Sequence, residues 1–342
     1  MANGYWPTRR HDGHVWTKGD IKRKKMQGKT LGYRAALCEV RGDWKFMKDV
    51  FCLPAWNEKS GCCWRCTCTP DGIRDVGLDA PWRQPANRLT HWDVIQRILE
   101  KGKRPSPLWN APWVRSCIFK IDWLHAADHG VTSAFLPNAM LLIMTKLPGG
   151  NIKDRCANLW RRIQELYGTR GVEDRMTGLT PTMLQPKSKS PALRASAAQC
   201  RALVPVIHEM AQGILVDADP HEQACKVALG ALHQCYMALS DGSIFWKEIL
   251  EESSRRFAAQ YVALEQTKKN AKHWRVKPKL HLFLELCSMG EKPSKFWAYR
   301  DEDFGGTCAR FARRRGGLLK PNATSRTMLQ KFMMKSKLPR IR

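Results

Sequence analysis

Five of the thirteen cysteines in this chain lie between positions 52 and 68, and the others are scattered singly along the rest of the sequence. Within the cluster, Cys63 and Cys66 form a C-x-x-C pair that follows the chain reversal at residues 59–61. Two thiolates at this spacing can bind one tetrahedral Zn²⁺, but a closed structural site needs two further ligands. The chain has no second C-x-x-C pair. We therefore expect the remaining ligands to come from residues that are distant in sequence.

His281 is the best placed of these distant residues, and Glu285 follows it by one helical turn. Histidine nitrogen and carboxylate oxygen are both ordinary zinc ligands. Two simpler alternatives stand beside a metal site. The cysteine-rich loop can pack without a metal, and His281 can be a packed or hydrogen-bonded side chain.

The charge of the chain indicates its partner. It carries 58 Lys and Arg against 31 Asp and Glu, a formal net charge of +27, so the folded body repels itself unless a polyanion offsets the field. The longest candidate for a membrane span, residues 134–147, is shorter than the roughly 18 to 20 apolar residues that a span needs. The N-terminus has no apolar segment typical of a secretory signal. We therefore expect an intracellular protein that binds DNA rather than a membrane.

Two basic runs are the expected DNA contacts, and both are typical of nuclear-import signals as well. Binding through such runs is non-specific and weakens steeply as salt rises. The sequence thus predicts a nuclear location. The runs are Lys22, Arg23, Lys24, Lys25 and Arg313, Arg314, Arg315.

Hydrophobic periodicity predicts an α/β layout with a large all-helical insertion. Apolar runs at 30–40 and 116–121 are typical of strands, with a cysteine-rich loop between them that continues to about residue 79. Helical patterns are predicted over 92–101, 123–147, 152–167, 191–216, 221–239 and 243–267. From these patterns we divide the chain into a basic arm without regular structure (1–29), a core with the cysteine-rich loop (30–125), a helical insertion (126–272), a return to the core (273–312) and a basic tail (313–342).

Three separated acidic residues stand where such a layout brings strand ends together. Asp43 follows the first expected strand, Asp122 ends the second, and Glu302 lies near the start of the last segment of the core. Carboxylates that converge in this way can hold the two Mg²⁺ ions of a phosphoryl-transfer site. Each of them is also an ordinary turn former, and Asp122 can simply cap the helix that follows it.

The order of these motifs resembles the catalytic domain of CACTA-type (En/Spm-like) DDE transposases. The resemblance extends over about residues 35–310, through motifs that are each short. The motifs are Gly42-Asp43, Cys63-x-x-Cys66, Ile121 to His125, Leu280 to Glu285 and Tyr299 to Phe304.

This resemblance implies a partial RNase H-like sheet in which Asp43 and Glu302 bind catalytic Mg²⁺ or Mn²⁺. It also implies that Cys63, Cys66 and His281 bind a structural Zn²⁺, and that Asp122 and His125 have a supporting role. Two departures from the family pattern matter. The chain has Glu285 where the family tends to have a second histidine, which leaves the fourth zinc ligand open. The candidates are Glu285, Cys287, Cys62 and Cys68.

The second departure concerns the first catalytic Asp of the family, because no apolar run before Thr30 is suited to the strand that would carry it. The leading hypothesis is therefore a transposase-derived DNA-binding protein whose ancestral activity, metal-dependent DNA strand cleavage and transfer, is incomplete. The alternatives are a non-catalytic zinc-dependent nucleic-acid-binding or scaffold protein, and a helical protein-interaction module over 126–270. No small-molecule substrate is expected, and self-association is left open.

Overall fold

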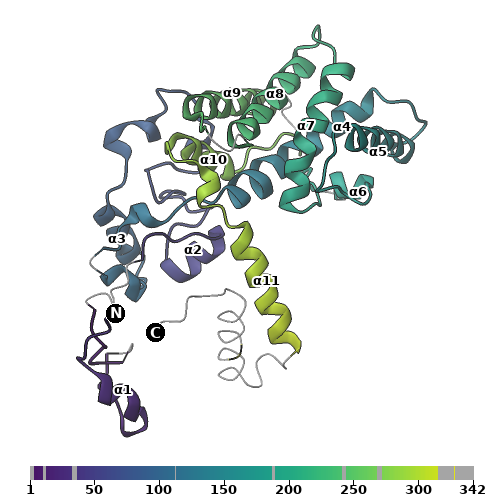
Figure 1. Cartoon of the computed structure of the whole chain (residues 1–342). Coiled ribbons are helices and arrows are strands. Elements are labelled where there is room, and N and C mark those ends of the chain that lie inside the picture. The colour runs from purple at the N-terminus through teal and green to yellow at the C-terminus, as the bar shows by residue number, and fades with distance from the viewer. Residues whose placement is uncertain are drawn as a thin grey trace.

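The computed structural model describes residues 4–10, 13–32, 37–111, 113–186, 189–240, 244–267 and 272–314, together with Thr327, and its regular structure is helical (Figure 1). The α-helices are α1 (Ile21–Met26), α2 (Trp44–Phe51), α3 (His91–Glu100), α4 (Ser133–Thr145), α5 (Ile152–Thr169), α6 (Pro181–Leu184), α7 (Ala197–Ile214), α8 (Pro220–Ser240), α9 (Lys247–Gln266), α10 (Lys279–Ser288) and α11 (Tyr299–Arg314). A π-helix, Leu124–Thr132, runs directly into α4. Short 3₁₀ turns lie at Lys18–Asp20, Gly72–Arg74, Pro81–Arg83, Pro85–Asn87, Pro107–Asn110, Ser116–Ile118 and Pro293–Lys295.

The expected α/β fold with a partial RNase H-like sheet is wrong. Within the described ranges, β-pairing is limited to isolated bridges, and no two strands form a ladder. The bridges join Tyr5 to Thr30, Arg9 to Val15, Val40 to Phe119 and Cys66 to Arg88. Helices, rather than helices on a sheet, therefore bury the apolar surface.

The two predicted strands do meet, but only at one residue pair. Val40 N donates to the carbonyl of Ile118 at 2.8 Å, and Lys120 N donates to the carbonyl of Val40 at 2.9 Å. A 3₁₀ turn directly before Phe119 and the start of α2 soon after Val40 leave no length for further pairing. Residues 33–36 of the first expected strand lie outside the described part of the chain. Short apolar runs do not by themselves distinguish a strand from another buried segment. Here the 3₁₀ turn and the start of α2 prevent the two runs from pairing further.

The predicted helices agree with the structure more closely than the predicted strands do, because long amphipathic periodicity is a stronger signal than a short apolar run. The predicted helices over 92–101, 123–147, 152–167, 191–216, 221–239 and 243–267 correspond to α3, the π-helix with α4, α5, α7, α8 and α9. The largest shift is at α7, which begins at Ala197. There the Ser196 hydroxyl accepts from Gln199 N at 3.2 Å, while the Gln199 side chain accepts from Ser196 N at 3.0 Å. This reciprocal cap fixes the helix start.

The N-terminal residues are more ordered in their local structure than the expected irregular arm. Trp6 N donates to the carbonyl of Lys29 at 2.8 Å, which closes a loop that carries α1. Figure 1 shows α1 at the far end of this loop, away from the other helices. The fold thus presents α1 outside the helical body.

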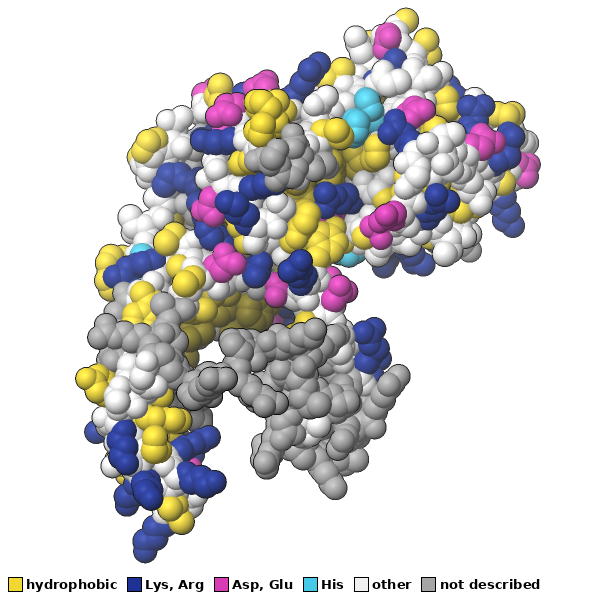
Figure 2. Space-filling model, in the orientation of Figure 1, with side chains coloured by type: hydrophobic (Ala, Val, Ile, Leu, Met, Phe, Trp, Pro, Cys, Tyr) yellow, Lys and Arg dark blue, Asp and Glu magenta, His cyan; other side chains and the backbone are white. Residues whose placement is uncertain are grey.

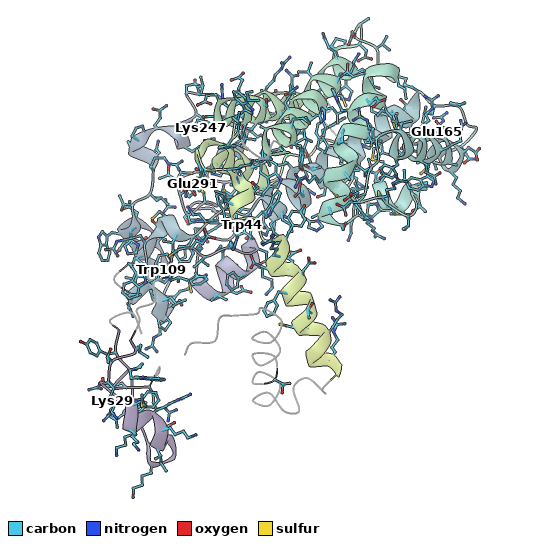
Figure 3. All side chains as sticks on the ribbon, viewed as in Figure 1. Lys29, Trp44, Trp109, Glu165, Lys247 and Glu291 are labelled. Atoms are coloured by element: carbon cyan, nitrogen blue, oxygen red, sulfur yellow. The ribbon has the colours of Figure 1, made fainter. Side chains whose placement is uncertain are left out.

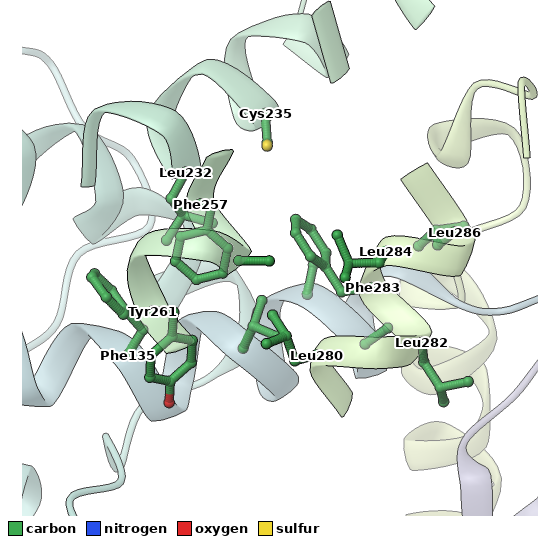
Figure 4. Close-up of a cluster of buried hydrophobic side chains, with 14 of the residues drawn as sticks. Phe135, Leu232, Cys235, Phe257, Tyr261, Leu280, Leu282, Phe283, Leu284 and Leu286 are labelled. Carbon is green, nitrogen blue, oxygen red and sulfur yellow. The ribbon is translucent and has the colours of Figure 1, made fainter. Parts of the chain in front are cut away.

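The helical body is centred on α8, α9 and α10, with α7 packed on α8 and the π-helix packed on α10. Aromatic rings join these elements edge to face (Figure 4): Phe257 lies 5.1 Å from Phe135 and 5.9 Å from Phe283 between ring centroids. Each such ring contributes roughly 1.5–3 kcal/mol by leaving water. Every residue from Leu280 to Cys287 is buried, so α10 is surrounded on all sides. Polar side chains on α10 are therefore enclosed by the core.

None of the helices described is long and apolar enough to cross a membrane.

Tryptophans hold the irregular region between α2 and the π-helix together (Figure 3). Their indole nitrogens donate to backbone carbonyls that the missing sheet leaves unpaired: Trp44 to Pro54 at 2.8 Å, Trp82 to Asp75 at 2.7 Å and Trp109 to Phe51 at 3.1 Å. Buried carbonyls need such partners. Indole donors thus stabilise a region that has little regular structure.

Candidate metal centre

The C-x-x-C loop is closed by its own backbone and fixed against a neighbouring segment. Cys62 N donates to the carbonyl of Cys68 at 2.9 Å, and Leu89 N donates to the carbonyl of Arg65 at 2.9 Å. Gly61, at φ +148°, allows the turn that enters the loop, where a Cβ would lie 2.8 Å from the Arg97 guanidinium. The loop therefore holds Cys63 and Cys66 in a buried position.

Helix α10 brings the remaining ligand atoms to this loop. His281 and Glu285 are four residues apart, so they share one face of the helix, and both are 1% exposed. His281 Nε2 lies 3.3 Å from Cys66 Sγ and 3.7 Å from a Glu285 carboxylate oxygen. One ligand atom from each of Cys63, Cys66, His281 and Glu285 lies within 4.8 Å of the others. This buried cluster can hold a metal ion.

Among the candidates for the fourth position, the geometry brings Glu285 into the cluster. Cys287 lies on the same helix but faces Ser254 and Glu251. Cys62 and Cys68 are adjacent to each other instead, with the Cys62 thiol donating to the carbonyl of Cys68 at 3.5 Å. The ligand group is thus two thiols, an imidazole and a carboxylate.

Two arginines balance the charge of Glu285. Arg88 donates both terminal nitrogens to its carboxylate at 2.6 and 2.8 Å, and Arg65 Nε lies 3.5 Å away. Burial acts to raise the pKa of Glu285, but the Arg88 hydrogen bonds and the His281 and Arg88 charges outweigh it, so this pKa is lowered. Bidentate arginine pairs are among the strongest charge-assisted contacts. Glu285 is therefore ionised inside the core, as a metal ligand must be.

Of the two thiols, Cys66 donates a hydrogen bond and Cys63 accepts it. Burial opposes ionisation of Cys63, yet the hydrogen bond from Cys66 and the charge of His281 lower the pKa of Cys63 to about 5. The hydrogen bond to Cys63 raises the pKa of Cys66. Thiolates are the metal-binding form of cysteine, so Cys63 can bind as it stands, whereas Cys66 would lose its proton to solvent on binding a metal.

The chemistry of the donor set also fits a metal at this position. His281 Nε2 is the imidazole nitrogen that faces Cys66 and Glu285, and the edge of Trp82 packs against the ring at 4.6 Å between ring centroids. Zinc binds thiolate sulfur, imidazole nitrogen and carboxylate oxygen, and structural zinc is almost always four-coordinate and tetrahedral. The residues present therefore fit a tetrahedral ion.

The acidic residues expected at the strand ends have other partners. Asp122 is buried and accepts from Ala298 N at 2.7 Å and from His125 Nδ1 at 2.5 Å, and His125 Nε2 lies 2.9 Å from Glu302. Burial lowers the pKa of His125, but Asp122 and Glu302 together raise it overall. Asp122, His125 and Glu302 thus form a chain of contacts that holds the start of α11 on the π-helix.

Asp43 caps a helix that the sequence did not predict. Its carboxylate accepts from Phe46 N at 2.5 Å and begins α2. Among the described residues, Cys63, Cys66, His281 and Glu285 are the one group whose ligand atoms come together. Asp43, Asp122 and Glu302 do not form a second one, so their role as catalytic metal ligands stays a prediction.

The basic runs lie at the periphery. Lys22, Arg23, Lys24 and Lys25 are all exposed on α1, and Figure 2 shows Lys and Arg side chains gathered at this end of the molecule. Arg313 is exposed at the end of α11. Of the other two residues in that run, Arg314 is described only as part of the helix, and Arg315 lies outside the described residues.

Sequence reasoning missed two ionisable residues, one beside the metal-ligand cluster and one in the core. Arg88 gave no signal, because it is one of 58 basic residues and lies far from Glu285 in sequence. The second is Asp128, which is fully buried in the π-helix. An acidic residue within an otherwise apolar helical stretch was a usable sign of it.

Fold and site together define a helical chain with a buried metal-ligand cluster of two cysteines, a histidine and a glutamate. No protein-family model matches the chain, and comparisons with curated proteins and with solved structures found no match.

Proposed function

We propose that this chain is a DNA-binding protein, derived from a CACTA-type transposase, whose fold is held by a structural Zn²⁺. The observation that carries the proposal is the buried group of Cys63, Cys66, His281 and Glu285. The motif order favours three of these positions, Cys63, Cys66 and His281, and left Glu285 as one of four candidates for the fourth. The four residues come from two segments more than two hundred residues apart. The proposal rests on the order of these motifs and on the cluster, and it does not include an RNase H-like sheet.

Charge balance favours zinc at this cluster. Two thiolates and one carboxylate around a divalent ion leave one net negative charge, and the two arginines beside Glu285, Arg88 and Arg65, offset it. Buried charges persist when they are paired and hydrogen-bonded. Zinc has no redox chemistry and accepts this donor set without a strong geometric preference. In a closed four-ligand site it supplies cross-linking of the loop to α10 rather than catalysis.

Zinc content tests this part directly. We expect about one zinc per chain in protein purified without chelator, and a loss of zinc in Cys63→Ser. Cys117→Ser is the matched control, because Cys117 is exposed and outside the cluster. Less than half an equivalent of zinc in the unmodified chain would contradict the proposal.

DNA is the proposed partner because of the net charge of +27 and the exposed run on α1. Each neutralised phosphate contributes about −0.9 to the slope of log affinity against log salt on duplex DNA. Replacing Lys22, Arg23, Lys24 and Lys25 by glutamine should reduce this slope by up to about 3 to 4. Salt titrations with fluorescent duplex DNA measure it, and Lys153→Gln on α5 is a single-charge control. An unchanged slope in the quadruple variant would rule out α1 as the contact.

The ancestral reaction, metal-dependent DNA strand cleavage and transfer, is proposed to be incomplete in this chain. Asp43 and Glu302 would be the carboxylates that hold Mg²⁺ or Mn²⁺, but Asp43 caps α2 and Glu302 contacts His125. We therefore expect no nicking or joining of DNA with either ion. Nicking that Glu302→Gln abolishes would show that the active site is complete. The alternative, a zinc-dependent nucleic-acid-binding or scaffold protein without this ancestry, predicts the same binding and no nicking.

A further inference from the structure

A cavity of about 380 Å³ lies between α4, the first turn of α5, the start of α8 and residues 273–274. This volume falls in the range of about 300–1,000 Å³ typical of small-molecule sites. Its walls are mainly apolar, with Leu141, Leu142 and Met144 on one side and Ile152 and Trp274 on others. The cavity shares no residue with the metal centre or with α1, so neither proposed function accounts for it.

The cavity has one clear anchor for charge, Arg155. Its Nε donates to the carbonyl of Gly149 at 3.1 Å, and its two terminal nitrogens have no ion-pair or hydrogen-bond partner among the described residues. Gly149 makes this approach possible: at φ +145° it lies so near the helix that a Cβ would be 2.9 Å from Arg155 N. None of the described residues that line the cavity is acidic. The site therefore favours an anion at this end.

Trp274 borders the cavity at a cost in backbone conformation. Its φ is +56°, in the left-handed region that bulky residues avoid. The conformation is held because Trp274 N donates to the Asn138 side chain at 2.9 Å, and its ring packs 5.3 Å from Phe135 and 5.7 Å from His221 between centroids. Backbone strain of this kind is concentrated at ligand sites. Trp274 is only 2% exposed, so Leu141, Leu142 and Ile152 form the accessible apolar wall of the cavity.

We propose that this cavity binds a largely apolar ligand that carries one anionic group. Its apolar part lies against Leu141, Leu142 and Ile152, and the anionic group meets the terminal nitrogens of Arg155. An aromatic carboxylate and a free nucleotide both have this chemistry. The proposal is independent of zinc and of duplex DNA binding, and it adds a ligand class that the sequence did not predict.

Calorimetric titration of the full chain, purified with its metal, tests the proposal with two matched pairs of probes. One pair is naphthoate and neutral naphthalenemethanol; the other is deoxyadenosine monophosphate and deoxyadenosine. We expect the anionic member of at least one pair to bind one to one, at least about tenfold more tightly than its neutral partner, since a charge-assisted hydrogen bond contributes this much. The pair that shows the difference identifies the source of the ligand.

Two variants assign the binding to this cavity. Arg155→Gln should remove the difference between anionic and neutral probes, while Arg161→Gln should leave it unchanged, because Arg161 is exposed on the same helix and pairs with Glu165. Leu142→Trp should fill the cavity and remove binding, with the melting curve as a check of folding. Equal affinity for anionic and neutral probes, no binding at about 1 mM, or normal binding by Arg155→Gln would each overturn the proposal.

Discussion

Two buried carboxylates have pKa values that are shifted in opposite directions. Glu285 lies beneath the cysteine-rich loop, and Asp128 lies at the junction of the π-helix, α8 and α11. Glu285 accepts two bonds from the Arg88 guanidinium. Asp128 accepts from the hydroxyls of Tyr236 at 2.5 Å and Tyr299 at 2.6 Å. Burial raises the pKa of both. The net result is a lowered pKa for Glu285 and, for Asp128, a pKa raised to about 7 in spite of its hydroxyl donors.

The difference shows what each region is suited to do. Neutral donors satisfy the hydrogen bonds of a carboxylate but do not offset the loss of hydration of its charge, whereas a bidentate cation does both. Glu285 is therefore a charged group available to a metal. Asp128 is a structural group that binds α11 to the core through Tyr299 and is nearly neutral in mildly acidic solution.

The largest expected effect is loss of the metal from the Glu285 region. Structural zinc contributes on the order of 10 kcal/mol of apparent binding free energy at neutral pH, so a chelator should lower the melting temperature strongly. Thermal melts with and without chelator measure this. Cys63→Ser should show the lower melting temperature in both conditions, and Cys117→Ser should behave like the unmodified chain. A melting temperature that does not respond to chelator would contradict a stabilising metal.

The second-largest expected effect is a pH dependence of the unfolding free energy that comes from Asp128. Its pKa is raised from 3.8 when unfolded to about 7 when folded, so the folded state binds the proton more tightly. The stability from this group is full below about pH 4 and is lost as the pH rises to about 7, a change on the order of 4 kcal/mol. Denaturant titrations across this range should show the loss in the unmodified chain but not in Asp128→Asn. Parallel pH profiles for the two proteins would show that Asp128 does not titrate in this way.

Arg88→Met tests the Glu285 side of the comparison between the two buried carboxylates. It leaves Glu285 buried without its bidentate guanidinium partner, and removing one partner of a buried pair costs about 3 kcal/mol or more. The matched control is Arg74→Met, because Arg74 makes the same two-nitrogen contact with Glu265 at 2.7 and 2.9 Å on the more exposed surface. That pair should contribute at most about 1 kcal/mol. Equal losses of unfolding free energy in the two variants would remove the distinction that we draw.

Tyr299→Phe should have the smallest effect, and one that depends on pH. It removes one hydroxyl donor from Asp128, which at pH 8 costs about 1 to 2 kcal/mol because the carboxylate is charged, and less at pH 5 because it is protonated. Denaturant titrations at the two pH values measure the difference. A larger loss at pH 5 than at pH 8 would contradict the assignment of charge to Asp128.

The sequence predicted the helices and singled out three of the four residues of the candidate metal cluster for separate reasons. Long periodic segments such as 152–167 carry many independent positions that agree on one face, so α5 was found to within a few residues. Cys63 and Cys66 were singled out because they form the one C-x-x-C pair of the sequence, and His281 because of the motif around it. Glu285 was one of four candidates, and only the packing of α10 against the loop separated it from Cys62, Cys68 and Cys287.

The sheet failed because its evidence was local and short. The expected strand over 116–121 has six residues, and its first three form a 3₁₀ turn. Asp43, expected as a ligand at a strand end, caps α2 instead. Arg88 could not be predicted, since no local pattern marks which arginines will meet Glu285 across the fold.

X-ray absorption at the zinc edge tests the central claim most directly, because it counts the atoms around the metal. If Cys63, Cys66, His281 and Glu285 bind the ion, the spectrum will show two sulfurs at about 2.3 Å and two nitrogen or oxygen atoms at about 2.0–2.2 Å. Glu285→Ala should keep both sulfurs and change only the lighter ligands. Three or four sulfurs would bring Cys62 or Cys68 into the site and contradict the assignment of Glu285, and the absence of zinc from the purified chain would contradict the site itself.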